Sequence, residues 1–332
     1  MENLRKLFFE LSSEDRLRIL QQLNKKAMNV TGLSKKLDLT TQESSRHVSR
    51  LSDVGLAQKD SNGLYHLTLH GRLVLKQLQG LTFTSQHKDY FTSHSLANLP
   101  SEFISRIGDL SGSKYVNDIS AAYSKIERLI QEADEYLLVI TDHYLMSILP
   151  LLRDAFKREV KTRNIEAKDW VVPFEIKERV RDLPWYQPTV NQARQSELLQ
   201  ERLLQRLDVY LYMSEKEVAM ISFPLAEGTF DYLGFTSKDE ASHKWCRDLF
   251  EHYWERAPSR ETLASELHKW IEKRPQAINV LRNIGAGKEI VHGKEQISEL
   301  ESRSLVKGGK PTILGDMILL ELQTKRIDTK QK

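Results

Sequence analysis

The stretch that most constrains the fold runs from Thr40 to Gly71 and reads "TTQESSRHVSRLSDVGLAQKDSNGLYHLTLHG". Its first part has a helical period that gathers Ser44, Val48 and Leu51 on one side. The opposite side carries polar groups only, at Gln42, Ser45, Arg46, Ser49 and Asp53. A helix that merely closes a core does not need such a face. Amides, hydroxyls and guanidinium groups are the groups that bond base edges and phosphates.

The residues around this helix indicate its boundaries and the elements after it. Thr40 is a suitable N-cap, and Glu43 lies at capping-box spacing from it. Gly55 fits the end of the helix. Two short strands are then expected, joined by a turn at Asn62-Gly63, because these residues tolerate a positive φ. Thr68 precedes a further helix, "GRLVLKQL".

Two shorter amphipathic segments come before this stretch, at about residues 13–23 and 31–37. The resulting order of helix, helix, helix, hairpin and helix is that of a winged helix-turn-helix. We therefore expect residues 1–80 to form a winged helix-turn-helix DNA-binding domain.

The charge distribution supports a polyanionic partner for this domain. Residues 1–80 contain 13 Lys and Arg against 8 Asp and Glu, a net charge of +5, whereas the rest of the chain has a net charge of −2. Positive charge concentrated in one domain is expected where that domain meets a nucleic acid. The predicted contacts to double-stranded DNA are Thr41, Gln42, Ser45, Arg46, Ser49, Arg50, Lys59, Asn62, Tyr65 and His66.

The segment "SSRHVSRLSDVGLAQKDSNGLYHLTLHGRLVL" resembles the recognition helix and wing of ArsR-type archaeal and bacterial regulators. The resemblance implies that Gln42, Ser45 and Arg46 enter the major groove. It also implies that the wing from Lys59 to His66 touches the DNA backbone or the minor groove. The cysteines with which some members sense metals are absent, because Cys246 is the only cysteine of the chain. Metal sensing is therefore not implied.

The middle of the chain is expected to form an α/β sensor domain. Residues 81–115 read as a linker with one helix over 101–110. From 116 to 257 helical and strand patterns alternate, and they include a predicted strand over 165–173 and a predicted helix over 196–207. Three segments, "NLPSEFISRIGDL", "EYLLVITDHYL" and "FDYLGFTSKDEASHKWCRDLFEHYWERA", resemble the middle domain of archaeal methanogenesis-regulatory (FilR-type) transcription factors. The resemblance implies a winged helix ahead of a sensing domain and names no effector.

A small-molecule or protein effector is expected at the sensor domain. Ligands of α/β sheets bind beyond the carboxyl ends of the strands, which here predicts a site at Thr141, Asp142, His143, Trp185, Asp231 and Trp245. Each residue also has a structural interpretation. Asp142 suits a helix N-cap, and Trp245 suits a core.

The C-terminal part, 258–332, contains a degenerate copy of the first domain. "ISELESRSLVKGGKPTILGDMILLEL" repeats the pattern of "VSRLSDVGLAQKDSNGLYHLTLHGRLVL" with a shorter wing. Aligning the copies on their leucines replaces Gln42 by Val291, Arg46 by Glu295 and Arg50 by Glu299. Because these carboxylates would repel phosphates, we predict that this second winged helix serves dimerisation or intramolecular docking.

Neither catalysis nor a membrane span is expected. The chain contains no Gly-rich phosphate loop, no HExxH or GxSxG motif and no metal-spaced Cys/His set. No cofactor or metal is therefore predicted, and the most apolar run is too short and polar to cross a bilayer. A single cysteine is typical of a reducing cytoplasm. The sequence thus predicts a cytoplasmic, homodimeric transcriptional regulator. The alternative is a protein–protein adaptor of the transcription machinery that uses its winged helices for partner contacts.

Overall fold

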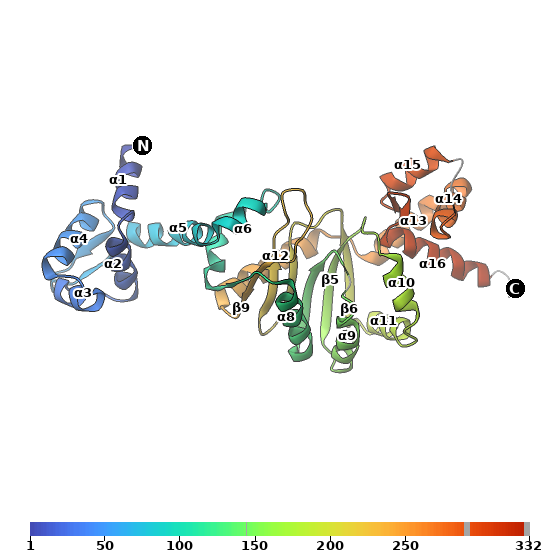
Figure 1. Cartoon of the computed structure of the whole chain (residues 1–332), viewed down its shortest axis with the longest axis horizontal. Coiled ribbons are helices and arrows are strands. Elements are labelled where there is room, and N and C mark those ends of the chain that lie inside the picture. The colour runs from blue at the N-terminus through green and yellow to red at the C-terminus, as the bar shows by residue number, and fades with distance from the viewer. Residues whose placement is uncertain (144, 289–292, 329–332) are drawn as a thin grey trace. The chain divides into compact units, whose positions relative to one another are not determined.

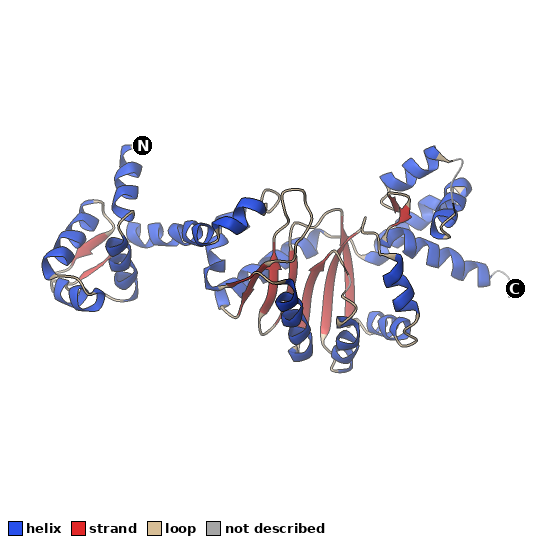
Figure 2. Ribbon diagram, viewed as in Figure 1, coloured by secondary structure: helices blue, strands red, loops and turns tan. Residues whose placement is uncertain are grey.

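The computed structural model describes residues 1–143, 145–288 and 293–328, with side chains described up to Leu322. Val291 therefore lies outside the described residues. The chain is a mixed α/β protein (Figure 2) that divides into two compact units. Unit 1 consists of Met1–Lys88 and Ser105–Ser111, and unit 2 consists of Asp89–Ile104 and the chain from Gly112 onward.

Unit 1 contains the elements in the order that the sequence predicts, with one helix added at the front. The elements are α1 (Glu2–Leu11), α2 (Glu14–Lys25), α3 (Val30–Leu37), α4 (Thr41–Asp53), β1 (Ala57–Lys59), β2 (Tyr65–Leu67) and α5 (Leu69–Gln86). The antiparallel pair β1 and β2 forms the hairpin. Helix α1 was not expected from the sequence, and its apolar residues Leu4, Phe8 and Phe9 remain largely exposed.

Helix α4 has the boundaries and the buried side that its pattern indicates. The Glu43 backbone N–H donates to Thr40 Oγ1 (3.1 Å), and the Thr40 backbone N–H donates to Glu43 Oε2 (2.9 Å). This reciprocal capping box fixes the first turn. Ser44, Val48 and Leu51 are fully buried. The opposite face is thereby turned to the outside of unit 1.

The segment 81–115 is more ordered than the linker with one helix that the sequence predicts. It contains the end of α5, α6 (Lys88–Ser93), α7 (Ser101–Ser105), the 3₁₀ helix η1 (Ile107–Gly112) and most of β3 (Lys114–Val116). Side chains that read as scattered in the sequence are buried here, among them Phe83, Tyr90, Phe103 and Leu110. The irregular apolar spacing reflects several short helices that each bury a few residues.

Unit 2 is built on a seven-stranded sheet with the strand order β3-β9-β8-β7-β4-β5-β6. The strands not yet given are β4 (Tyr136–Thr141), β5 (Lys161–Ala167), β6 (Leu199–Leu204), β7 (Tyr210–Ser214), β8 (Val218–Ser222) and β9 (Gly234–Ser237). Strands β4, β5 and β6 are parallel neighbours, and the other pairs are antiparallel. In Figure 1, α8 (Ile119–Glu132) and α9 (Ile148–Lys157) lie in front of this sheet and α12 (Glu240–Arg256) lies behind it.

Two predictions for this sheet are wrong. Residues 196–207 do not form a helix, because their central part is the edge strand β6, paired with β5. The leucines of "ELLQERLL" suit either period, and the hydrogen-bonding edge of β5 decides for the strand. The strand predicted over 165–173 is displaced toward the N-terminus and ends at Ala167. Two helices, α10 (Phe174–Arg181) and α11 (Tyr186–Gln195), connect β5 to β6.

The C-terminal repeat has the element order of unit 1 from α2 to α5. Its elements are α13 (Arg260–Glu272), α14 (Pro275–Gly285), α15 (Lys294–Ser302), β10 (Val306–Lys307), β11 (Lys310–Pro311) and α16 (Ile313–Asp328). The junction between the hairpin and the last helix is the same in both copies. Thr68 Oγ1 accepts from the Gly71 N–H (2.9 Å), and Thr312 Oγ1 accepts from the Gly315 N–H (3.1 Å).

The two glycines at this junction occupy equivalent notches. A Cβ on Gly71 would lie 2.1 Å from the Leu56 carbonyl oxygen, and a Cβ on Gly315 would lie 2.1 Å from that of Leu305. Alanine is favoured over glycine in a helix by about 1 kcal/mol, but this clash outweighs the preference. We expect Gly71→Ala and Gly315→Ala each to lower the free energy of unfolding by about 1–3 kcal/mol in a denaturant titration.

A matched control lies in the same helix α5. A Cβ on Gly80 would lie 3.3 Å from a methyl group of Ile107, which a small side-chain movement accommodates. Gly80→Ala should therefore cost clearly less than Gly71→Ala. Equal effects of the two substitutions would contradict the proposed carbonyl clash.

The C-terminal repeat docks on the β6 side of the sheet within unit 2. Leu203 of β6 belongs to the same buried cluster as Leu300. Two ion pairs surround this contact, Lys307 with Asp169 (2.7 Å) and Lys177 with Asp316 (2.5 Å). Apolar burial and paired charges hold the C-terminal repeat against this edge of the sheet, and its role in dimerisation or docking stays a prediction.

Candidate functional site

The polar face of α4 is exposed in unit 1. On the other side of the helix, Ser44, His47 and Val48 are buried against the core. The exposed members are Thr41, Gln42, Ser45, Arg46 and Ser49. Together with Arg50 they line a shallow hollow on the surface. The helix therefore presents amide, hydroxyl and guanidinium groups on one continuous surface, which we call the α4 face.

Arg50 differs from the other predicted contacts because an acidic side chain of unit 1 holds it. Its Nη2 lies 2.7 Å from Glu10 Oε1, and its Nε lies 3.0 Å from Glu10 Oε2. The guanidinium group also stacks on the Phe9 ring, 5.2 Å from the ring centroid. Glu10 is buried and pairs with Arg16 as well (3.1 Å). Helix α1 thereby fixes Arg50 at the margin of the α4 face, an arrangement that was not expected from the sequence.

The hairpin carries the four remaining predicted contacts. Lys59 and Asn62 are exposed, and the Lys59 ammonium lies 5.8 Å from the Tyr65 ring centroid. His66 forms a hydrogen bond of 2.8 Å with Gln58 on the neighbouring strand. The turn is shaped by Asp60, whose Oδ1 accepts from the N–H groups of residues 62 and 64. The positive φ falls on Gly63 (79°) and not on Asn62.

The predicted effector residues fall in different places of unit 2. Thr141, His143 and Trp185 line one cavity of about 230 Å³. Asp142 accepts from the Tyr232 hydroxyl (3.3 Å) and lines a neighbouring hollow at the carboxyl ends of the strands. Asp231 pairs with His94 (3.1 Å) and does not line the cavity.

Trp245 is the predicted site residue that the structure contradicts. It is fully buried against the sheet on α12, and its indole N–H donates to the Phe103 carbonyl oxygen (3.2 Å). A side chain with no exposed surface and a satisfied N–H belongs to the core, so Trp245 does not form part of an effector site.

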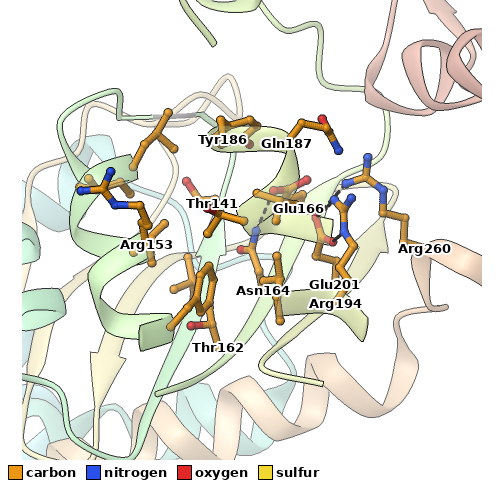
Figure 3. A pocket seen from close by; sticks show the side chains of 18 of the residues that line it. Thr141, Arg153, Thr162, Asn164, Glu166, Tyr186, Gln187, Arg194, Glu201 and Arg260 are labelled. Atoms are coloured by element: carbon orange, nitrogen blue, oxygen red, sulfur yellow. Dashed lines mark hydrogen bonds and ion pairs between the residues drawn. The ribbon is translucent and has the colours of Figure 1, made fainter. Parts of the chain in front are cut away.

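The register of the sheet determines the polar side of the cavity. Tyr212, Val139, Asn164 and Glu201 are direct partners across β7, β4, β5 and β6 and form one row. Because side chains alternate along a strand, Thr162 and Glu166 lie on the same face of β5 as Asn164. Figure 3 shows the polar side chains that line the cavity, which include Thr162, Asn164, Glu166, Glu201, Arg194 and Arg260. Helices α9 and α11 supply the other walls.

The strongest charges of the cavity are paired with one another. Glu201 accepts from Arg194 (2.5 Å) and from Arg260 (2.8 Å), the first residue of α13. Burial opposes ionisation of Glu201, but Arg260 and Arg194 outweigh it and lower the pKa of the carboxyl group. Burial and the carboxylates of Glu166 and Glu201 raise the pKa of Tyr186 to about 12.

The sequence did not reveal the polar row on β5, because the predicted strand began only at residue 165, after Thr162 and Asn164. The signal that could have revealed it is the alternation in "KTRNIEA". A central parallel strand covered on both faces normally reads as a continuous apolar run. Thr162, Asn164 and Glu166 break that rule at every second position, and this pattern points to a polar wall beneath the helices.

The described part of the chain supplies no evident metal site or membrane segment. Among its residues, no group of three or more His, Cys, Asp or Glu side chains is arranged to hold a metal ion. The sulfur of Cys246 is fully buried, which raises the pKa of its thiol well above the ordinary value. No helix among the described residues is long and apolar enough to cross a membrane.

The comparison with family models addresses unit 1. Residues 4–88 match the family model described as the HVO_A0261 N-terminal domain. This match includes the α4 face and the hairpin, and it leaves the rest of the chain unassigned. Comparison with curated proteins gives no match.

Two solved structures show distant similarity. The first is that of TrmBL2, described as an archaeal chromatin protein with a novel mode of DNA binding. It is 15% identical, with 74% of this chain and 93% of that chain covered and a TM-score of 0.34. The second is the apo form of SibL, an S-adenosylmethionine-dependent methyltransferase. It is 12% identical, with 59% and 62% covered and a TM-score of 0.22. At these TM-scores neither similarity bears on function.

Proposed function

We propose that the chain is a non-catalytic, DNA-binding transcriptional regulator in which unit 1 acts as a winged helix-turn-helix domain. The α4 face carries this proposal. It is polar and exposed, while the other side of the same helix is buried. The Gln42 amide can donate and accept, and the Arg46 guanidinium donates, which are the bidentate patterns that read base edges in the major groove. The hairpin adds the exposed Lys59 and Asn62.

The C-terminal repeat has a different role in this proposal. The positions of Arg46 and Arg50 are occupied there by Glu295, which is exposed, and by Glu299, which lies 3.8 Å from Arg274. Two carboxylates on a groove-facing helix would repel phosphates. DNA contact is therefore assigned to unit 1. A homodimer would place two α4 faces on the half-sites of a palindromic operator.

The cavity is the proposed place for an effector. Besides the sheet, α9 and α11, two helices of the C-terminal repeat reach it, through Arg260 of α13 and Leu320 of α16. A molecule bound there would contact both parts of unit 2. If the molecule bound one arrangement of the sheet and the C-terminal repeat more tightly than another, it would raise the population of that arrangement. DNA binding by the homodimer would change as a result.

We expect Arg46→Ala to weaken binding to a specific operator by about 1–3 kcal/mol, because it removes a base or phosphate contact. The operator would first be obtained by selecting genomic fragments bound by the full-length protein, with and without cell metabolites. Binding would then be measured by a mobility shift at several salt concentrations.

Arg5→Ala provides the matched control, because Arg5 is exposed on α1 and is not part of the α4 face. It removes the same charge from unit 1 and should change affinity far less. If both variants lose affinity equally, only the net charge matters and the α4 face is not the reading surface. If the selection recovers no specific fragment, the regulator function itself fails.

A further inference from the structure

We propose that the cavity of unit 2 binds a small, mostly apolar molecule that carries a neutral hydrogen-bond donor, such as an aromatic N–H or a hydroxyl group. The inference deepens the proposed function, since it names the chemical class of the effector. Three observations carry it: the unpartnered polar atoms of the cavity, the pairing of its charges, and the nature of its walls.

The unpartnered atoms lie on β5. Thr162 is 4% exposed, and its Oγ1 forms no hydrogen bond with any described residue. The Asn164 amide N–H donates to Glu166 Oε1 (2.7 Å), which fixes the orientation of the amide. The other atom of that amide, Oδ1, is buried and also has no partner among the described residues. Because a buried polar group without a partner is costly, this wall favours a ligand that donates to Asn164.

The charges of the cavity argue against an anionic ligand. Arg194 and Arg260 both bind Glu201, and Arg153 stacks on the Trp185 ring at 4.6 Å and bonds to Asp154 (3.3 Å). No lysine lines the cavity among the described residues. An anion would have to compete with these carboxylates for the guanidinium groups, whereas a neutral donor leaves the pairs as they are.

The remaining walls set the size and polarity of the molecule. Val139, Leu149, Leu152 and Phe156 face the cavity from β4 and α9, with the Trp185 ring beside them. The cavity has a volume of about 230 Å³. This volume lies below the range of about 300–1,000 Å³ of pockets for drug-sized ligands, so a molecule of one or two rings suits it.

The test uses two pairs of probes that differ only in the donor. Indole and benzofuran share a shape, but only indole has an N–H group. Phenol and anisole differ in the same way through the hydroxyl group. Binding to the full-length protein, without DNA, would be followed by ligand-observed NMR and by calorimetry. We expect indole and phenol to bind on the order of fivefold more tightly than their partners, as one hydrogen bond to a neutral acceptor implies.

Two substitutions connect this preference to the wall. Asn164→Leu removes the acceptor, and Thr162→Val removes a hydroxyl group with almost no change of shape. Asn164→Leu should reduce the preference for the donor probes toward onefold, whereas Thr162→Val, which keeps the Asn164 acceptor, should reduce it less. Thr162→Val should leave the stability of the ligand-free protein unchanged or raised, because its hydroxyl is unsatisfied. Gln200→Leu is the control, because Gln200 is exposed and lies on the opposite face of β6. It should leave the preference unchanged.

Equal affinities within each pair would overturn the proposal, as would tighter binding of benzoate than of phenol. Failure of all four probes to bind at millimolar concentration would overturn it too. A preference that survives Asn164→Leu would overturn the proposal as well. Because none of these measurements includes DNA, their failure is distinct from a failure to select an operator. The ligand class can be wrong while the DNA-binding function holds, and the reverse is also possible.

Discussion

Replacing Glu201 with alanine is expected to lower the free energy of unfolding by about 3–5 kcal/mol, the typical cost of leaving a buried charge without its partner. Glu201 is 7% exposed and holds two guanidinium groups, those of Arg194 and Arg260. Its removal leaves both cations partly buried and detaches the start of α13 from β6. Chemical denaturation of the full-length protein, monitored in unit 2 by hydrogen exchange, measures the loss.

The control for this prediction is Glu255→Ala. Glu255 is exposed on α12, so its replacement should change stability by no more than about 0.5 kcal/mol. A loss below about 1 kcal/mol for Glu201→Ala would mean that water solvates the two arginines as well as the carboxylate does. The cluster would then contribute little to the docking of the C-terminal repeat.

The same cluster gives stability a defined dependence on pH. The arginines lower the pKa of Glu201 in the folded protein below the ordinary glutamate value, which is about 4.3. The contribution of Glu201 is therefore fully present above that ordinary value and is lost as the pH falls through the lowered pKa. Glu201→Gln should be less stable than the wild type at neutral pH, and the difference should shrink in acid. A constant difference would contradict the assignment.

Leu51→Ala and Leu300→Ala are each expected to cost about 2–5 kcal/mol, as for fully buried leucines that leave a cavity. Both side chains have no exposed surface. They occupy equivalent places in the two copies but belong to separate cores. Hydrogen exchange should show lost protection in α2–α4 for Leu51→Ala and in α13–α16 for Leu300→Ala.

Leu69→Ala is the control, because Leu69 is 86% exposed at the start of α5. Its replacement should leave protection in both cores unchanged. If Leu51→Ala lowered protection across the sheet of unit 2 as strongly as in unit 1, the two units would unfold together, and the division into separate cores would be wrong as a description of stability.

Local patterns accounted for much of unit 1. The two faces of α4 follow from the helical period alone, and the capping box of Thr40 and Glu43 involves residues three apart. The junction of Thr68 with Gly71 is equally local, and its repetition at Thr312 and Gly315 revealed the second copy. Such features can be read from sequence because the interacting groups are neighbours along the chain.

The cavity and the ion pair of Glu10 with Arg50 depended instead on contacts between residues distant in the sequence. Glu10 reaches Arg50 only because the fold brings the end of α1 close to Arg50. Asn164 and Glu201 are brought into one row by the parallel pairing of β5 with β6, and that pairing also makes a strand of the leucine-rich segment that favoured a helix. The sequence by itself determined the exposed polar helix and the repeated junction, since periodicity and capping act within a few residues. Tertiary structure alone decided where Glu201 and Trp245 lie, because hydrogen bonding between strands and burial against a sheet join residues that no local pattern connects.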